Sequence, residues 1–225
     1  MRVSLGMAAV AVAGALVAGL GMGGKAHAAD LIPYPNSGLY NATTYSFTAA
    51  ADGDVIGYIV GGFAAGFTNE VGMLDNGVLT GAGYGLNNHG SSQGDSFNFG
   101  TVSAGDVLTF VMHNLSLGAY AYSNPAMNLA YDDPDYTGGH NHIYSTSYTA
   151  TSPNFAGVPA GRYVAFEDIP FPGADFNYDD ESFVFTNTAA HDGIPEPGAW
   201  IMMILGFAGA GTALRRSMAL ARLAA

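Results

Sequence analysis

The sequence predicts an all-β fold, an antiparallel β-sandwich or jelly roll formed by residues 29–192, with an apolar segment at each end of the chain. Two observations predict this fold class. Residues 29–192 contain no long run with helical period, and short runs rich in β-branched and aromatic residues recur between clusters of Gly, Asn, Asp and Pro. Many short strands separated by turn signals are typical of antiparallel sandwiches and jelly rolls.

The first 28 residues have the composition of a signal peptide. Met1-Arg2 is a short basic start, residues 3–20 are apolar, and residues 25–28 read Lys-Ala-His-Ala, the small-x-small pattern that signal peptidase needs. We predict that residues 1–28 are cleaved off by signal peptidase, with Ala29 as a less favoured end. The competing interpretation is an uncleaved N-terminal anchor. Either way, the domain that follows is expected outside the cytoplasm.

Eight segments of the predicted domain have strand composition: residues 43–48, 55–60, 95–99, 107–113, 119–122, 142–150, 162–166 and 182–186. Asp75-Asn76-Gly77 lies between the short apolar pairs 73–74 and 78–79, which predicts a hairpin of the Asn-Gly type. We expect the glycine-rich residues 81–94 to form a loop.

Aromatic residues recur on single faces of these predicted strands, as with Tyr144 and Tyr148 or Phe183 and Phe185. Such residues mostly fill the core of a sandwich, and this is the interpretation that we favour. A platform that stacks against sugar rings is the alternative.

The charge of the predicted domain is strongly negative. Residues 29–192 contain 17 acidic residues and Arg162 as the one Lys or Arg, which gives a formal charge of −16. Such a surface repels nucleic acid and anionic lipid and attracts cations, so nucleic-acid binding is excluded. The chain has no cysteine, which excludes disulfides and thiolate metal sites.

An acidic motif lies between the predicted strands 162–166 and 182–186. Oxygen ligands at alternate positions of a tight loop suit a hard cation, and we predict a structural calcium site there. The candidate ligands are Glu167, Asp168, Asp175, Asn177, Asp179 and Asp180. The alternative is a solvated acidic loop with Asx-turns, because Asp and Asn are favoured in turns.

This motif is not an EF-hand, because that loop needs Gly at its sixth and Glu at its twelfth position, where Asp180 and Thr186 stand. The segment resembles instead the acidic pattern of DUF4114-type β-sandwich domains of bacterial surface proteins. The matching residues are Phe166, Glu167, Asp168, Gly173, Asp175, Asn177, Tyr178, Asp179, Asp180 and Phe183 to Phe185. Glu181-Ser182 is an insertion relative to that pattern. The resemblance implies a calcium-associated extracellular module.

The tail, residues 193–225, has the order of a membrane anchor. Two prolines around Glu196 hold the chain extended, Trp200 follows, and residues 200–214 carry no charge. Two arginines then follow this uncharged run, as positively charged residues follow a membrane span on its cytoplasmic side. We predict a single transmembrane helix here, although the run counted from Gly198 to Leu214 only just reaches the lower limit of about 17 residues. A buried Gly/Ala-rich helix is the alternative.

The tail resembles the PEP-CTERM sorting signal of Gram-negative bacteria. The residues that carry the resemblance are Pro195, Glu196, Pro197, Trp200, Arg215 and Arg216. The extension 217–225 departs from the family, whose members usually end soon after the arginines. The resemblance implies an exosortase as partner, a transient inner-membrane anchor, and final delivery to the outer surface or the extracellular space.

Other chemistry has weaker support in the sequence. His140 and His142 stand two residues apart and could chelate a metal from one strand face, but we favour structural or surface histidines. The acidic cluster 132–135 is expected to be a surface turn. No Gly-x-Ser-x-Gly, His-Glu-x-x-His or phosphate-binding glycine loop is present, although Glu167 and a nearby Asp could form a glycosidase pair.

These observations together predict a non-enzymatic exported or cell-surface protein associated with exopolysaccharide or biofilm matrix. A carbohydrate-binding or carbohydrate-active β-sandwich is the alternative function. An unprocessed inner-membrane protein is a third possibility.

Overall fold

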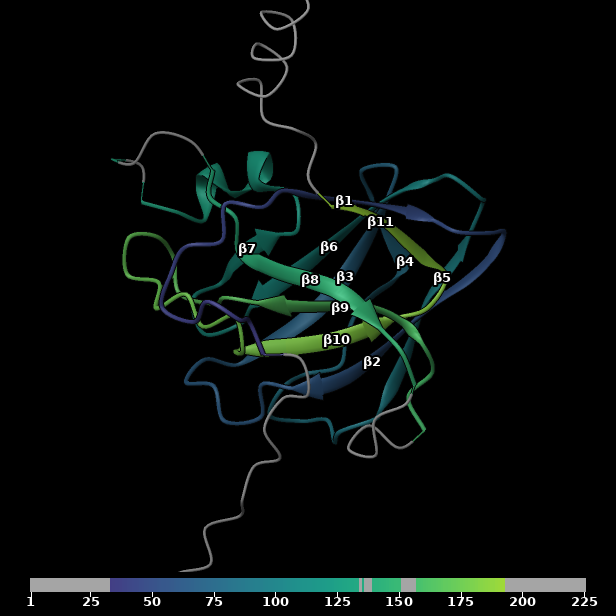
Figure 1. Cartoon of the computed structure of the whole chain (residues 1–225), viewed down its shortest axis with the longest axis horizontal. Helices are drawn as coiled ribbons and strands as arrows, with labels where there is room; N and C mark the ends of the chain where they lie inside the picture. The colour runs from purple at the N-terminus through teal and green to yellow at the C-terminus, as the bar shows by residue number, and fades with distance from the viewer. Residues whose placement is uncertain (1–32, 134, 136–138, 151–156, 193–225) are drawn as a thin grey trace, which may run out of the picture.

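The computed structural model of the chain describes residues 33–133, 135, 139–150 and 157–192 (Figure 1). The predicted signal peptide, residues 1–28, and the predicted sorting signal, residues 193–225, lie outside this part of the chain. Within it, none of the helices is long and apolar enough to span a membrane.

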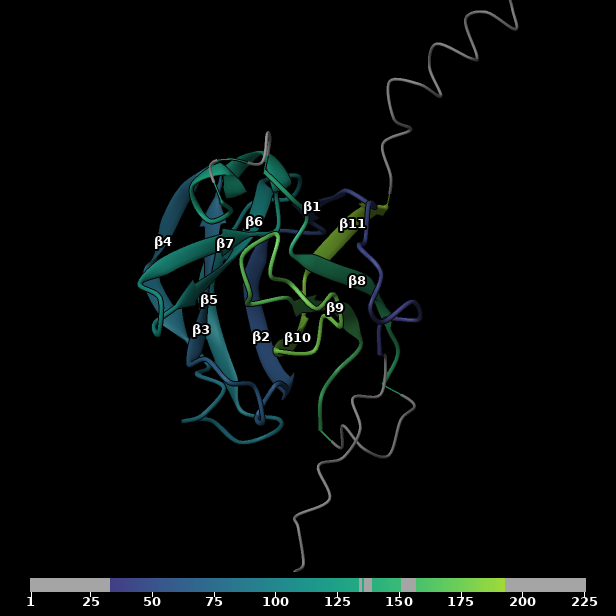
Figure 2. The same cartoon turned by 90° about the vertical axis from the view of Figure 1, so that its left-hand side faces the viewer.

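The described residues form two antiparallel sheets (Figures 1 and 2). A six-stranded sheet has the order β11-β1-β6-β3-β4, with β7 also paired to β6. Its strands are β1 (Tyr45–Ala49), β3 (Asn69–Asp75), β4 (Val78–Gly85), β6 (Val107–Asn114), β7 (Ala119–Tyr122) and β11 (Thr188–Asp192). A five-stranded sheet has the order β5-β2-β10-β9-β8. Its strands are β2 (Gly53–Gly61), β5 (Ser96–Val102), β8 (Ile143–Tyr148), β9 (Gly161–Phe166) and β10 (Glu181–Phe185), and a short 3-10 helix, η1 (Pro125–Ala130), follows β7.

The main core lies between the two sheets, which confirms the predicted all-β, sandwich-like fold. Alternate residues of most strands point into it, as the period of two of a half-buried strand requires, whereas β4 contributes none. Phe110 of the six-stranded sheet stacks on Phe185 of the five-stranded sheet, with ring centroids 3.8 Å apart. Phe183 is also fully buried there, so the predicted core role of Phe183 and Phe185 is confirmed.

A second apolar cluster covers the outer face of the five-stranded sheet. Tyr163 and Val184 project from its strands, and Tyr34 and Tyr178 close over them from segments outside the sheet. Tyr148 is buried in this cluster, and Tyr144 is partly buried against it. The predicted packing role of these two tyrosines is therefore also confirmed, although they pack on the outside of the sheet.

All eight predicted strands are present, with shifted ends, and so is the hairpin between β3 and β4. Asn76 and Gly77 have φ of 47° and 84°, the left-handed values that a two-residue turn of this type requires. The sequence analysis missed β11, and its prediction of a loop over residues 81–94 is wrong for the first five of them. There β4 continues to Gly85. A side chain would not fit at this position, because the Phe97 ring lies 2.6 Å from where a Cβ would be.

Candidate metal centre

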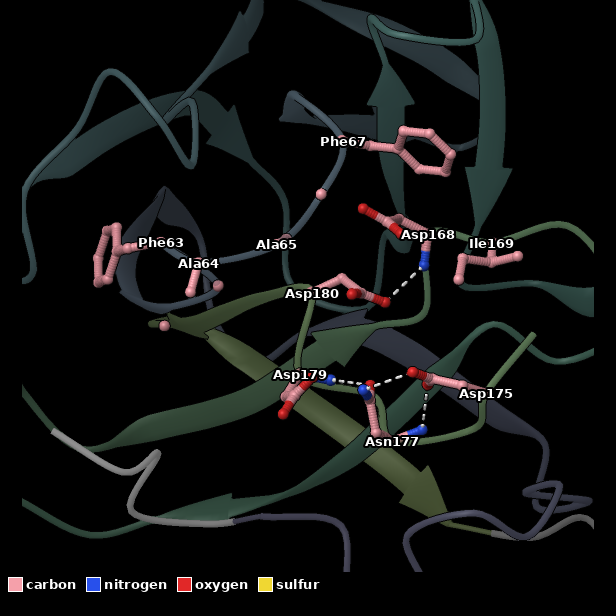
Figure 3. A pocket seen from close by; sticks show the side chains of 13 residues that line it. Phe63, Ala64, Ala65, Phe67, Asp168, Ile169, Asp175, Asn177, Asp179 and Asp180 are labelled. Atoms are coloured by element: carbon pink, nitrogen blue, oxygen red, sulfur yellow. Dashed lines mark hydrogen bonds between the residues drawn. The ribbon is translucent and has the colours of Figure 1, made fainter. Parts of the chain in front are cut away.

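The pairing of two neighbouring strands gathers the acidic motif at one end of the five-stranded sheet. β9 and β10 are antiparallel, and Phe166 at the end of β9 pairs with Glu181 at the start of β10. Residues that follow β9 therefore lie beside residues that precede β10. Figure 3 shows the result, in which Asp168 and Asp180 face each other across the chain reversal.

Three of the six predicted ligands converge. Glu167, Asp168 and Asp180 each offer a carboxylate oxygen within 4.8 Å of those of the other two. Backbone groups hold them in place: Asp168 N donates to Asp180 Oδ2 at 3.0 Å, and Phe176 N donates to Glu167 Oε2 at 2.8 Å. Three carboxylates fixed at this spacing form a possible site for a cation.

Burial and mutual repulsion make the ionised state of these carboxylates costly. Burial, with the charges of Asp180 and Asp175, raises the pKa of Glu167 to about 8. Burial, with the charge of Asp168, raises the pKa of Asp180 to about 7. Among the described residues, no ion pair of a basic side chain with these carboxylates is seen, and Arg162, the one Lys or Arg of residues 29–192, donates from Nε to Ser145 Oγ. Relief must come from protons or from a bound cation.

Two buried groups beside the three carboxylates have oxygen atoms without a hydrogen-bond partner. They are both carboxylate oxygens of Glu181 and the Oδ1 atom of Asn69. Asn69 is tied to the acidic residues, because its Nδ2 donates to Asp168 Oδ2 at 2.6 Å. Burial, followed by the charge of Asp168, raises the pKa of Glu181 well above its usual range. Unpaired buried oxygens are rare in native proteins, so these groups call for a proton, a water molecule or a cation as partner.

The sequence analysis missed both groups. Asn69 belongs to β3 of the opposite sheet, and no sequence pattern connects it to the motif. Glu181 had a usable signal: it alternates with Phe183 and Phe185, so its side chain had to share their inward face.

A cleft of about 530 Å³ opens over the acidic residues. One wall is the loop that follows β2, residues 61–67, and the other walls include Asp168, Asp179 and Asp180 (Figure 3). Gly62 has φ of 95°, and a Cβ there would overlap with the carbonyl oxygen of Asp180. Only glycine at this position lets the loop contact the backbone at Asp180, in the acidic segment between β9 and β10.

The other three predicted ligands, Asp175, Asn177 and Asp179, line the same cleft but use their side chains locally. Asn177 N donates to Asp175 Oδ1, and Asp179 N donates to Asn177 Oδ1, each at 3.1 Å (Figure 3). These are the Asx-turns that the alternative interpretation expected. Tyr178, between Asn177 and Asp179, is buried in the outer cluster instead. The role of Asp175, Asn177 and Asp179 as metal ligands stays a prediction.

A separate buried cluster joins Asp132 to the two histidines. Asp132 Oδ1 lies 2.7 Å from His142 Nε2, and Asp132 Oδ2 lies 3.1 Å from His140 Nδ1. His142 Nδ1 lies 3.1 Å from the carbonyl oxygen of Glu167, so both of its ring nitrogens face oxygen atoms. The expected surface turn is thus wrong for Asp132, whereas Asp133 and Asp135 are exposed. The favoured structural role of His142 agrees with these contacts.

Comparison of the chain with family models, with curated proteins and with solved structures found no match in any of the three.

Proposed function

We propose that the chain is a non-enzymatic exported protein whose β-sandwich binds a structural calcium ion in the acidic cleft. The tail is a sorting signal that an exosortase recognises, so the membrane anchor is transient. The domain then resides on the outer surface or in the extracellular space, in association with exopolysaccharide. The tail residues Pro195, Glu196, Pro197, Trp200, Arg215 and Arg216 carry the sorting step.

The observation that carries the cation site is the meeting of converged carboxylates with unpaired buried oxygens. Glu167, Asp168 and Asp180 supply the converged group, and Glu181 and Asn69 supply oxygens that have no other partner. A cation held by the converged carboxylates offsets their negative charge and gives Glu181, which the charge of Asp168 disfavours as an anion, a positive neighbour. The donor set is all oxygen, which suits calcium and other hard cations.

A calcium titration tests the site. At a free calcium concentration ten times the Kd, binding to the folded state alone adds about 1.4 kcal/mol to the free energy of unfolding. For a domain of this size we expect the Tm of the full chain, purified in detergent, to rise by about 3–6 °C. Differential scanning calorimetry with calcium and with EDTA measures this shift.

Asp180→Asn is the matched variant for that titration. The new amide oxygen still accepts from Asp168 N, but the charge is lost, so the calcium shift should disappear. Asp133→Asn removes one exposed charge elsewhere and should keep the wild-type shift. A wild-type Tm that does not respond to calcium, or an Asp180→Asn variant with the full shift, contradicts the proposed site.

Sorting is tested in a Gram-negative host that has an exosortase. A tagged chain with Pro195→Ala and Glu196→Ala should accumulate in the inner-membrane fraction, because the recognised element is lost. The wild-type chain should lose its tail and leave that fraction. Equal distribution of both chains in the membrane would show that the tail is a permanent anchor.

A further inference from the structure

The outer face of the six-stranded sheet carries a group of aromatic rings that lies on neither apolar cluster. Strands β4, β3, β6 and β7 lie side by side there (Figure 2). The register places Tyr84, Gly72, Val111 and Tyr122 in one row across the strands, and Glu70, His113 and Tyr120 in the next. Because Val71, Met73 and Met112 point into the core, these intervening residues point outward. We call Tyr84, His113, Tyr120 and Tyr122 the tyrosine platform.

Three rings of the tyrosine platform lie close together, with His113 and Tyr84 tilted by 51° at 5.3 Å and two other pairs at shallower angles. The rings of His113 and Tyr120 stack at 4.5 Å and 17°, and those of Tyr84 and Tyr120 lie 6.1 Å apart at 34°. Tyr120 is 39% exposed. By contrast, the tyrosines on the outer face of the five-stranded sheet are covered, with Tyr163 only 1% exposed.

A glycine makes room for one of these rings. A Cβ at Gly72 would lie 2.8 Å from two carbons of the Tyr84 ring. The ring therefore lies over the backbone of β3, which a side chain at this position would prevent. Val111, next in the same row, is fully buried. The glycine at position 72 thus lets the Tyr84 ring lie against the sheet backbone.

Polar groups border the platform. Glu70 Oε1 lies 3.0 Å from His113 Nδ1, and the two side chains are 24% and 18% exposed. Within the described part of the chain, the hydroxyl groups of Tyr84, Tyr120 and Tyr122 make no hydrogen bond. Burial and the neighbouring Tyr120, Tyr122 and Glu70 raise the pKa of Tyr84 to about 12, so its hydroxyl stays a donor.

We propose that the tyrosine platform binds the sugar rings of an uncharged polysaccharide. Polymers with ring-shaped units, such as polysaccharides and nucleic acids, can stack their rings on aromatic side chains. The formal charge of −16 repels nucleic acid, which leaves polysaccharide. The same charge disfavours anionic polysaccharides. Free tyrosine hydroxyls and the Glu70 carboxylate are suited to sugar hydroxyls rather than to an aliphatic partner. This inference rests on the proposed association with exopolysaccharide and does not depend on the cation.

The test is binding of the full chain to a panel of glucans, mannans and galactans, with alginate as the anionic member. We expect binding to at least one uncharged polysaccharide and none to alginate. Tyr84→Ala and Tyr120→Ala should each weaken binding by at least about fivefold, because each variant removes one of the rings on which a sugar would stack. Tyr40→Ala is the matched control, since Tyr40 is 40% exposed but belongs to another part of the surface.

Each alternative outcome has a defined meaning. No binding to any uncharged member, or full binding by both platform variants with unchanged Tm, overturns the inference. A concentration-dependent dimer that Tyr120→Ala dissociates would show that a second copy covers this face, and would also overturn it. If Asp180→Asn or EDTA abolishes binding and the platform variants do not, the sugar lies in the acidic cleft. In that case the proposed function stands and the platform does not.

Discussion

Replacing Asp132 with alanine is expected to lower the free energy of unfolding by about 3–5 kcal/mol, because it leaves buried polar and charged groups without a partner. The Asp132 side chain is almost fully buried and serves four donors. Besides the rings of His142 and His140, it accepts from His140 N at 2.9 Å and from Phe171 N at 3.0 Å. It therefore ties the segment after η1 to the start of β8 and to the loop that begins the acidic motif.

Urea unfolding of the variant and the wild type measures this loss. Asp133→Ala is the control, since Asp133 is the exposed neighbour and its loss should change stability by less than about 0.5 kcal/mol. Asp132→Asn should lie between the two, because the amide keeps one acceptor for the backbone donors. A loss below about 1 kcal/mol in Asp132→Ala would mean that water replaces the carboxylate at no cost.

Lowering the pH should remove the stabilising contribution of the Asp132 carboxylate in the wild type. Burial alone would raise the pKa of Asp132, but the hydrogen bond and charge of His142 outweigh it and lower the pKa from 3.8 to about 2. A carboxyl group with a lowered pKa stabilises the fold above its unfolded pKa and loses that effect as pH falls to the folded value. The contribution should therefore be complete above about pH 4 and fade towards pH 2, and Asp132→Asn should lack this part of the pH dependence.

Replacing Glu181 with leucine is expected to stabilise the calcium-free protein by about 1–3 kcal/mol. The Glu181 carboxyl group is completely buried on the face that carries Phe183 and Phe185, and neither of its oxygens has a hydrogen-bond partner. Leucine removes this unsatisfied group and adds apolar contacts. Because the carboxylate is also the group that most needs a cation, the variant should show a smaller calcium-induced rise in Tm than the wild type.

Paired thermal unfolding in EDTA and in calcium checks both parts of this prediction. Glu181→Leu should raise the Tm without calcium but reduce the rise that calcium causes, so the Tm values of variant and wild type should differ most in EDTA. Phe183→Leu, two residues along on the same face, is the control and should destabilise the protein in both buffers. If Glu181→Leu lowers the Tm in EDTA, the carboxyl group has a stabilising partner and the cation site loses its main support.

The parts of the fold that the sequence could predict depend on neighbours along the chain. Alternation places Phe183 and Phe185 in the core, and the Asn76-Gly77 turn specifies the β3–β4 hairpin. Glu167 and Asp180 could be predicted as a pair because one short connection joins the strands that hold them.

The parts that could not be predicted depend on contacts between distant segments. The bond from Asn69 to Asp168 spans 99 positions, and it joins the two sheets. Asp132 appeared to belong to a surface turn because three aspartates within four positions hide which one is buried. Tyr84 lay in the expected glycine-rich loop 81–94, since Gly81, Gly83 and Gly85 look like turn residues until the Phe97 ring beside Gly85 is seen.

The place of β11 has a consequence for the release of the domain. β11 is the edge strand of its sheet and pairs along its whole length with β1. It ends at Asp192, three positions before Pro195, so a proposed exosortase cut at the Pro-Glu-Pro element would leave it in place. A cut before Thr188 would instead expose the hydrogen-bonding groups of β1, and an open strand edge recruits other chains. The distance between strand and sorting motif thus allows the domain to be freed without becoming prone to aggregation.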